Sequence, residues 1–203
     1  TAAICAVLVP IHWDGQQAST AAPKIDDLLT VMIVLSSLVF SLVVVMLFYA
    51  LWKFRAKPGD ESDGEPIHGN TRLEVAWTLI PTVIVLFAGG YSWSVLNDIE
   101  KPADNPLTVD VFSQQYAWSF GYPGKDMVWS EGEFHVPVNR QVQFKMHAQD
   151  VIHSFWVPQW RIKKDNVPGI TTIAIVTPTK TGTYQLICTE LCGFGHSSMR
   201  AKV

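Results

Sequence analysis

The stretch LLTVMIVLSSLVFSLVVVMLFYALW, residues 28–52, decides the fold because it contains no charged residue. About 20 apolar residues cross a bilayer as a helix, so this run can span a membrane with some tilt. Residues 75–96 form a second uncharged run, and Pro81 in its second turn is tolerated in membrane helices. A chain of 203 residues is too short to bury two such helices on all sides, which disfavours a soluble core.

The polar segment between the two runs, residues 53–72, predicts the orientation of the helices. Its basic residues close to the helix ends are Lys53, Arg55, Lys57 and Arg72. The opposite ends offer only Lys24 and Lys101. Because basic loops favour the cytoplasmic side of a membrane, we expect residues 53–72 in the cytoplasm and both termini outside.

These patterns divide the chain into three expected parts. Residues 1–25 form an extracytoplasmic segment, and residues 98–203 form an extracytoplasmic domain. Between them, residues 26–97 form a transmembrane hairpin with helices over about residues 28–55 and 73–97. Residues 1–12 hold a short apolar run that cannot span alone, and we expect either a signal remnant or an additional anchor.

The composition excludes several classes of protein. Apolar residues make up 48% and charged residues 16% of the chain, and the aromatic residues include eight Trp and ten Phe, so the chain is not disordered. The net charge of −3 excludes a nucleic-acid-binding protein that works through bulk positive charge. Three cysteines are too few for a disulfide scaffold.

From Leu107 onward the periodicity changes from helical to alternating. In QVQFKMHA, residues 141–148, the side chains of Val142, Phe144 and Met146 share one face, which we expect to be buried. Further strands are expected over residues 107–112, 116–120, 133–138, 171–177 and 183–187, with turn signals between them. Short strands at this spacing predict a β-sandwich or Greek-key barrel.

The strongest chemical signal is CTELCGFGHSSM, residues 188–199, which follows directly on a predicted strand. Its candidate metal ligands are Cys188, Cys192, His196 and Met199. HSFWVP, residues 153–158, adds His153. Thiolate and thioether ligands are soft and favour copper, whereas Ca²⁺ and Mg²⁺ prefer oxygen. Zinc binds two cysteines and two histidines, but it has no use for a methionine.

The presence of two thiols favours more than one ion. A single copper in an electron-transfer site uses one Cys, two His and a weak axial Met. If Cys188 and Cys192 bridge two coppers, one histidine remains for each ion, with weak contacts from Met199 and a carbonyl such as that of Glu190. Such a closed cluster indicates an electron relay. A disulfide, a zinc site or separately buried structural residues are the alternatives.

The order of these features resembles subunit II of the haem-copper terminal oxidases, the cytochrome c oxidases with a CuA centre. The resemblance covers nearly the whole chain from Asp26 and implies a transmembrane two-helix hairpin followed by an all-β cupredoxin-like sandwich. In that family the dinuclear copper would be held by His153, Cys188, Cys192, His196, Met199 and the carbonyl of Glu190. The Glu190 carboxylate would face a Mg²⁺ or Mn²⁺ shared with subunit I.

The resemblance also implies roles for residues outside the copper site. LEVAWTLIP, residues 73–81, places Glu74 at the cytoplasmic mouth of a proton path into subunit I; a favourable contact with the helix dipole is the plain alternative. QYAWSF, residues 115–120, resembles the surface where electrons enter, with Tyr116 or Trp118 as the receiving side chain. Four acidic residues would steer a basic donor or form a solvated rim: Asp126, Glu131, Glu133 and Asp150.

The implied activity is electron transfer within an oxidase. Reduced cytochrome c, or a small copper protein, would give single electrons to CuA, and CuA would pass them to a haem in subunit I. There O₂ would be reduced to water while protons are pumped. The chain would not be catalytic alone. It would lie in lipid with subunit I and other oxidase subunits, in a bacterial plasma membrane or alternatively a mitochondrial inner membrane, and would bind no nucleic acid.

Three other functions remain open on the sequence. A quinol oxidase subunit II shares the fold but has lost the copper, which the intact ligand set argues against. A CuA-type nitric oxide reductase subunit would share every ligand. A membrane-tethered copper carrier or assembly protein would need exposed and exchangeable ligands, whereas two bridging cysteines with two histidines indicate a permanent site.

Overall fold

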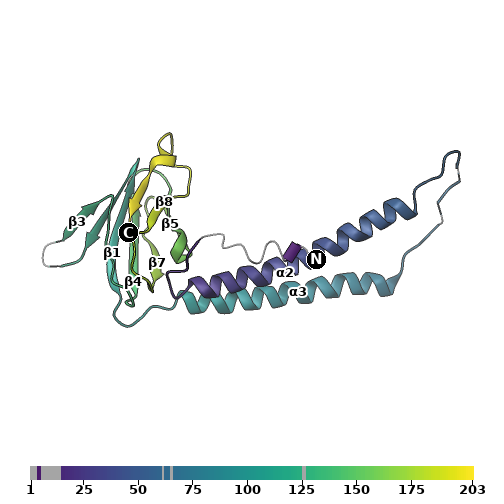
Figure 1. The fold of residues 1–203 in the computed structure, drawn as a ribbon, viewed down its shortest axis with the longest axis horizontal. Helices are drawn as coiled ribbons and strands as arrows, with labels where there is room; N and C mark the ends of the chain where they lie inside the picture. Colours follow the sequence, from purple (N-terminus) through teal and green to yellow (C-terminus); the bar gives the residue numbers. More distant parts are fainter. Residues whose placement is uncertain (1–3, 6–14, 61, 65, 125–126) are drawn as a thin grey trace. The chain divides into compact units, whose positions relative to one another are not determined.

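A computed structural model of the chain describes residues 4–5, 15–60, 62–64, 66–124 and 127–203. The chain divides into two compact units (Figure 1). The first comprises Thr1–Ile11 with Leu28–Ser94, and the second comprises His12–Asp27 with Val95–Val203. Apart from Ile4 and Cys5, the residues expected to form a signal remnant or an anchor lie outside the described part of the chain.

The first long helix, α2, spans Ala22–Lys53 and begins before the uncharged run. Its start is set by Ser19, whose Oγ accepts a hydrogen bond from the backbone N–H of Ala22 at 3.1 Å. A serine in this position satisfies a helix N–H group that has no partner within the helix. The first turns of α2 therefore belong to the second unit, and the apolar run follows them.

The second long helix, α3, spans Thr71–Ile99 and includes Pro81. The side-chain oxygen of Asn70 accepts hydrogen bonds from the backbone N–H groups of Arg72 and Leu73 at 3.1 and 3.2 Å, which caps the helix. Both long helices are apolar and long enough to cross a membrane, and few of their side chains are buried. The predicted pair of membrane helices is confirmed.

The second unit is a sandwich of two β-sheets. One sheet has the strand order β3-β2-β1-β4-β7 and the other has the order β6-β5-β8-β9 (Figure 1). The strands are β1 Leu107–Gln114, β2 Ala117–Tyr122, β3 Val128–Glu131, β4 Val142–Ala148, β5 His153–Val157, β6 Ile162–Asn166, β7 Thr172–Val176, β8 Gln185–Cys188 and β9 Arg200–Lys202. Only β1 and β4 pair in parallel among the named strands. The predicted cupredoxin-like sandwich is confirmed.

The core of the sandwich lies between the two sheets and is rich in aromatic side chains. On β4, Val142, Phe144 and Met146 are all buried, as the alternation predicts. The ring of Phe144 lies 5.0 Å from that of Phe155 and 5.7 Å from that of Phe134, measured between centroids. Burial of such large apolar surfaces stabilises the sandwich and holds the strand ends in place.

The prediction of a strand over residues 133–138 is wrong. In this segment only Glu133 forms a β-bridge, with Lys202. Phe134 is buried, and its N–H donates to the carbonyl of Lys202 at 2.9 Å, so backbone pairing with β9 is confined to the start of the segment. Pro137 has no N–H to donate, and the N–H of His135 is bonded to the hydroxyl of Tyr122 at 2.7 Å. The short strands β3, β5, β6 and β9 were not predicted from the sequence.

Replacing Phe144 with alanine should lower the free energy of unfolding by about 3–5 kcal/mol, because it opens a cavity in the aromatic core. Unfolding of the purified full chain in detergent, followed by tryptophan fluorescence, measures this loss. Phe194 is 105% exposed, so Phe194→Ala is the matched control, with an expected change within about 0.5 kcal/mol. Equal effects of the two substitutions would show that the core is assigned wrongly.

Candidate metal centre

Two neighbouring strands bring the first two candidate ligands together. His153 is the first residue of β5, and Cys188 is the last residue of β8. These strands pair antiparallel, with Phe155 directly opposite Cys188. The sheet therefore fixes the imidazole beside the first thiol, although the two residues are far apart in the sequence.

A tight loop between β8 and β9 supplies the other candidates. The backbone N–H of Cys188 donates to the carbonyl of Met199 at 3.1 Å, which closes the loop at its base. Within the loop, the N–H of His196 donates to the carbonyl of Gly193 at 3.1 Å. Gly193 has a φ of +130°, which other residues rarely adopt. The loop thus turns back so that Cys192, His196 and Met199 face Cys188.

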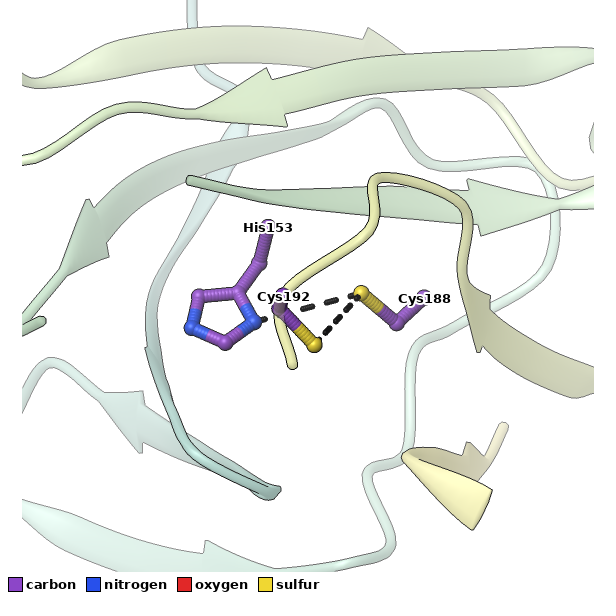
Figure 2. A group of neighbouring side chains, drawn as sticks. All are labelled: His153, Cys188 and Cys192. Carbon is purple, nitrogen blue, oxygen red and sulfur yellow. Dashed lines mark hydrogen bonds between the residues drawn. The ribbon is translucent and has the colours of Figure 1, made fainter. Parts of the chain in front are cut away.

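The four nearest ligand atoms form two thiol–imidazole pairs. The Nδ1 atom of His153 lies 3.9 Å from the sulfur of Cys188, and the Nδ1 atom of His196 lies 3.7 Å from the sulfur of Cys192. The two sulfurs are 3.8 Å apart. Figure 2 shows the His153 imidazole directed at this pair of sulfurs. His153, Cys188 and Cys192 are all buried, and their ligand atoms lie within 4.8 Å of one another.

Two weaker ligand atoms complete the cluster. The thioether sulfur of Met199 lies 3.8 Å from the sulfur of Cys192, and the carbonyl oxygen of Glu190 lies 3.4 Å from the sulfur of Cys188. Each thiol therefore has one imidazole and one weak ligand atom beside it. This set of sulfur and nitrogen atoms suits a soft metal such as copper and is unsuited to Ca²⁺ or Mg²⁺.

The two cysteines are free thiols in this structure. Their separation of 3.8 Å is well beyond the length of a disulfide bond, about 2.05 Å. Burial, together with the neighbouring sulfur of Cys188, raises the pKa of Cys192 to about 11. In the metal-free protein this thiol is therefore protonated at neutral pH, and a bound metal must displace its proton. Metal binding is consequently expected to weaken as the pH falls.

The ring of His153 is oriented by Asp150, which the sequence analysis assigned to donor docking. The Nε2–H of His153 donates to Oδ1 of Asp150 at 2.8 Å, which leaves Nδ1 free to bind a metal. Burial opposes ionisation of Asp150, but hydrogen bonds from His153 and from the N–H groups of Gln115 and Val151 lower the pKa of this carboxyl. The carboxylate thus stays charged and holds the imidazole.

The segment that carries Tyr116 also touches the loop between β8 and β9, residues 189–199, which we call the metal loop. The side-chain amide of Gln115 donates to the carbonyl of Cys192 at 2.6 Å, a contact that the sequence analysis missed. A Cβ added to Gly195 would lie 2.5 Å from the ring of Tyr116, so the loop backbone packs directly against this ring. Tyr116 is 39% exposed, whereas Trp118 is 1% exposed and lies 6.2 Å from the ring of His153.

The remaining predicted residues lie apart from this cluster of ligand atoms. Glu74 is exposed in the first turn of α3. Glu131 ends β3, and Glu133 contacts His135 at 3.2 Å. The Glu190 carboxylate is exposed and belongs to none of the metal-binding groups found among the described residues. Asp126 lies outside the part of the chain that the structure describes.

Comparisons with known proteins cover both units of the chain. The family "Cytochrome C oxidase subunit II, transmembrane domain" matches residues 12–95, and "Cytochrome C oxidase subunit II, periplasmic domain" matches residues 125–203. Cytochrome c oxidase subunit 2 of Synechocystis sp. is 35% identical over 93% of this chain and 73% of its own length. The protein of the same name from Thermostichus vulcanus is 34% identical over the same shares.

Among solved structures, the periplasmic domain of subunit II of cytochrome oxidase from Bradyrhizobium japonicum is similar to this chain. It is 29% identical with a TM-score of 0.47, over 50% of this chain and 83% of that one. The sequence matches by themselves carry the assignment, because they span both the helices and the sandwich. The chain belongs to the cytochrome c oxidase subunit II family, whose members are parts of haem-copper oxidoreductase complexes.

Proposed function

We propose that this chain receives electrons for a haem-copper oxidase and holds them at a dinuclear copper centre, CuA. The observation that carries the proposal is the pair of thiols 3.8 Å apart, each with its own imidazole and one weak ligand atom. The residues that would hold the two ions are His153, Cys188, Cys192, His196, Met199 and the Glu190 carbonyl.

When bound, such a centre supplies one-electron storage shared over two ions, which keeps the bond changes on reduction small. The protein residues supply a rigid and dry enclosure for it. His153, Cys188, Cys192 and Met199 are buried, so water has little access to the ligand atoms. The pairing of β5 with β8 and the closed base of the loop fix the ligands before any metal binds.

Burial of the ligands also separates this function from that of a copper carrier. A carrier must release its metal to a partner and therefore needs accessible ligands. Here both thiols and the imidazole of His153 are buried. This observation favours a permanent electron relay. A CuA-type nitric oxide reductase subunit would need the same enclosure and is the second candidate function.

We infer that electrons enter at Tyr116 rather than at Trp118. The ring of Tyr116 is partly exposed and packs on the backbone of the metal loop at Gly195, so it links the surface to the ligands. Trp118 is enclosed in the core beside His153. The donor would be reduced cytochrome c or a small copper protein, and a basic donor would be attracted by Glu131 and Glu133, which are exposed.

The electron would leave toward a haem in subunit I, where O₂ is reduced to water and protons are pumped. The basic residues of segment 53–72 favour a cytoplasmic loop, which would place the sandwich on the outer side of a bacterial plasma membrane or of a mitochondrial inner membrane. Glu74 at the start of α3 would then lie on the side from which protons are taken up. A Mg²⁺ or Mn²⁺ at the Glu190 carboxylate stays a prediction.

Metal analysis of the purified full chain tests the dinuclear site. We expect two coppers per chain and a purple oxidised protein, because two bridging thiolates bind the ions as a pair. Cys192→Ser should abolish this colour, since one thiolate cannot bridge both ions. Cys5→Ser removes a thiol outside the cluster and should leave the spectrum unchanged. One copper per chain, zinc, or an unchanged spectrum in Cys192→Ser would refute the assignment.

Asp150→Asn should weaken copper binding by about 10–100-fold, because the amide is a weaker acceptor for the Nε2–H of His153. Competition with a copper chelator at pH 7 measures the change. Glu131→Gln is the control, since Glu131 is exposed at the end of β3 and should bind copper as the unmodified chain does. Equal affinity of the Asp150→Asn chain would show that the carboxylate does not orient the ligand.

Tyr116→Leu should slow reduction of the copper centre by the donor while the copper spectrum is kept, because the surface aromatic ring is lost. Rapid mixing of reduced donor with the assembled oxidase measures this rate. Trp129→Leu removes another exposed aromatic residue, on β3, and should have no effect on the rate. If the donor reduced the copper centre of Tyr116→Leu at the normal rate and that of Trp118→Phe slowly, the inference would be wrong, and Trp118 would be the residue that receives the electron.

A further inference from the structure

The segment before the first membrane helix is built into the sandwich. We call residues 15–26 the N-terminal strap; it comprises the segment before α2 together with the first residues of that helix. The backbone N–H of Ala18 donates to the carbonyl of Gln159 at 2.8 Å, and that of Thr20 donates to the carbonyl of Thr177 at 3.0 Å. Ala18 is fully buried. The strap therefore joins two connections of the sandwich, the one that follows β5 and the one that follows β7, before the chain continues as α2.

A single arginine ties the strap to the end of β5. Nε of Arg161 donates to Oδ1 of Asp26 at 2.8 Å, and a terminal nitrogen donates to Oδ2 of the same carboxylate at 3.0 Å. The guanidinium also donates to the carbonyls of Pro158 at 2.8 Å and Gly15 at 3.1 Å. The side chain of Arg161 is 3% exposed. The Asp26 side chain is 26% exposed, so the pair is partly buried. Two parallel charge-assisted bonds in such a place make a strong and directional contact.

The backbone of Arg161 is unfavourable for an arginine. Its φ is +57°, in the left-handed region that glycine adopts without cost. Its N–H donates to the carbonyl of Pro158 at 3.0 Å and closes the turn after β5. A residue other than glycine that keeps such a backbone conformation is held in it by contacts with its surroundings. The ion pair with Asp26 is one of the contacts that hold it.

This turn is connected to the metal centre by one strand. His153 begins β5, and Arg161 follows the short 3₁₀ helix Pro158–Trp160 at the other end of that strand. β5 has five residues, so it spans roughly 13 Å at about 3.3 Å per residue. It is an inner strand, paired with both β6 and β8. Hydrogen bonds to both neighbours therefore restrain β5 between the turn at Arg161 and His153.

We propose that Arg161 is a positioning residue for electron transfer out of the copper centre. It binds Asp26 in the first turns of α2 and thereby fixes the N-terminal strap to the metal-bearing sandwich, within the same compact unit. The inference rests on the proposed function, because it concerns the transfer of one electron from the reduced centre to the oxidised haem of subunit I. No bond forms or breaks in this step, so its rate depends on the distance between the two centres.

Arg161→Gly tests the proposal in the assembled oxidase. Glycine tolerates the left-handed backbone, so this substitution removes the ion pair without adding strain. Asn139→Gly is the matched control, since Asn139 has a φ of +59° in an exposed turn. Arg161→Lys keeps the charge and loses the double hydrogen bond. This variant replaces Arg161→Gly in the test if Arg161→Gly does not assemble into the oxidase.

Two readouts separate positioning from a purely structural role. In Arg161→Gly the copper spectrum and reduction by the donor should match those of the unmodified oxidase, while electron transfer from the photoreduced copper centre to the haem slows several-fold. Amide hydrogen exchange in residues 15–26 should become about ten- to a hundredfold faster, because the strap loses a double charge-assisted hydrogen bond to the sandwich. For Arg161→Lys, both the rate of electron transfer to the haem and the rate of hydrogen exchange should lie between those of the unmodified oxidase and Arg161→Gly.

An unchanged onward rate in Arg161→Gly, or in Arg161→Lys, would overturn the proposal. So would hydrogen exchange in the strap no faster than that of Asn139→Gly. The exchange measurement needs no copper and tests the tie between strap and sandwich even where the copper assignment fails. An unmodified chain without a dinuclear copper signal would contradict the proposed function and, with it, the role of Arg161 in electron transfer.

Discussion

The antiparallel pairing of β5 with β8 is the constraint on which the rest of the structure depends. It places His153 and Cys188 side by side at one end of the sandwich, although the two residues are far apart in the sequence. The loop that follows Cys188 closes on itself through the carbonyl of Met199, so the second thiol returns to within 3.8 Å of the first. The aromatic core beneath holds both strands in this register.

Polar contacts around the ligands turn this arrangement into a defined site. Asp150 binds the Nε2–H of His153 and the backbone N–H of Gln115, and the Gln115 side chain binds the carbonyl of Cys192. One carboxylate and one amide thus connect the β5 ligand with the loop ligands. The ring of Tyr116, the next residue after Gln115, packs against the loop between β8 and β9 at Gly195. The surface that would receive electrons and the ligands that would hold them therefore form one packed group.

The sequence predicts the parts whose chemistry is local. Uncharged runs identify the two membrane helices, because lipid excludes charge over the whole length of a helix. The sequence also predicts the candidate ligands that the structure brings together, since two thiols, two imidazoles and a thioether are rarely gathered in one short motif and its neighbour. The alternation over residues 141–148 identified the buried face of β4 for the same local reason.

Contacts between distant segments were not predictable from these patterns. The segment 133–138 alternates because Phe134 is buried, and the alternation could not report that its backbone is not paired as a strand. From the sequence, Asp150 was interpreted as a surface charge. Its hydrogen bond to His153 depends on β5 beginning at His153, and that strand was not predicted. Arg161 carried no sequence signal at all, because its partner Asp26 lies in another part of the chain.

The most direct measurement of the central claim is the electron paramagnetic resonance spectrum of the purified, copper-loaded full chain. Two thiolates that bridge two ions should share one unpaired electron equally, so the hyperfine pattern should show coupling to two equivalent copper nuclei. A pattern from a single copper nucleus would contradict the account. It would mean that the paired sulfurs of Cys188 and Cys192 do not hold two ions together.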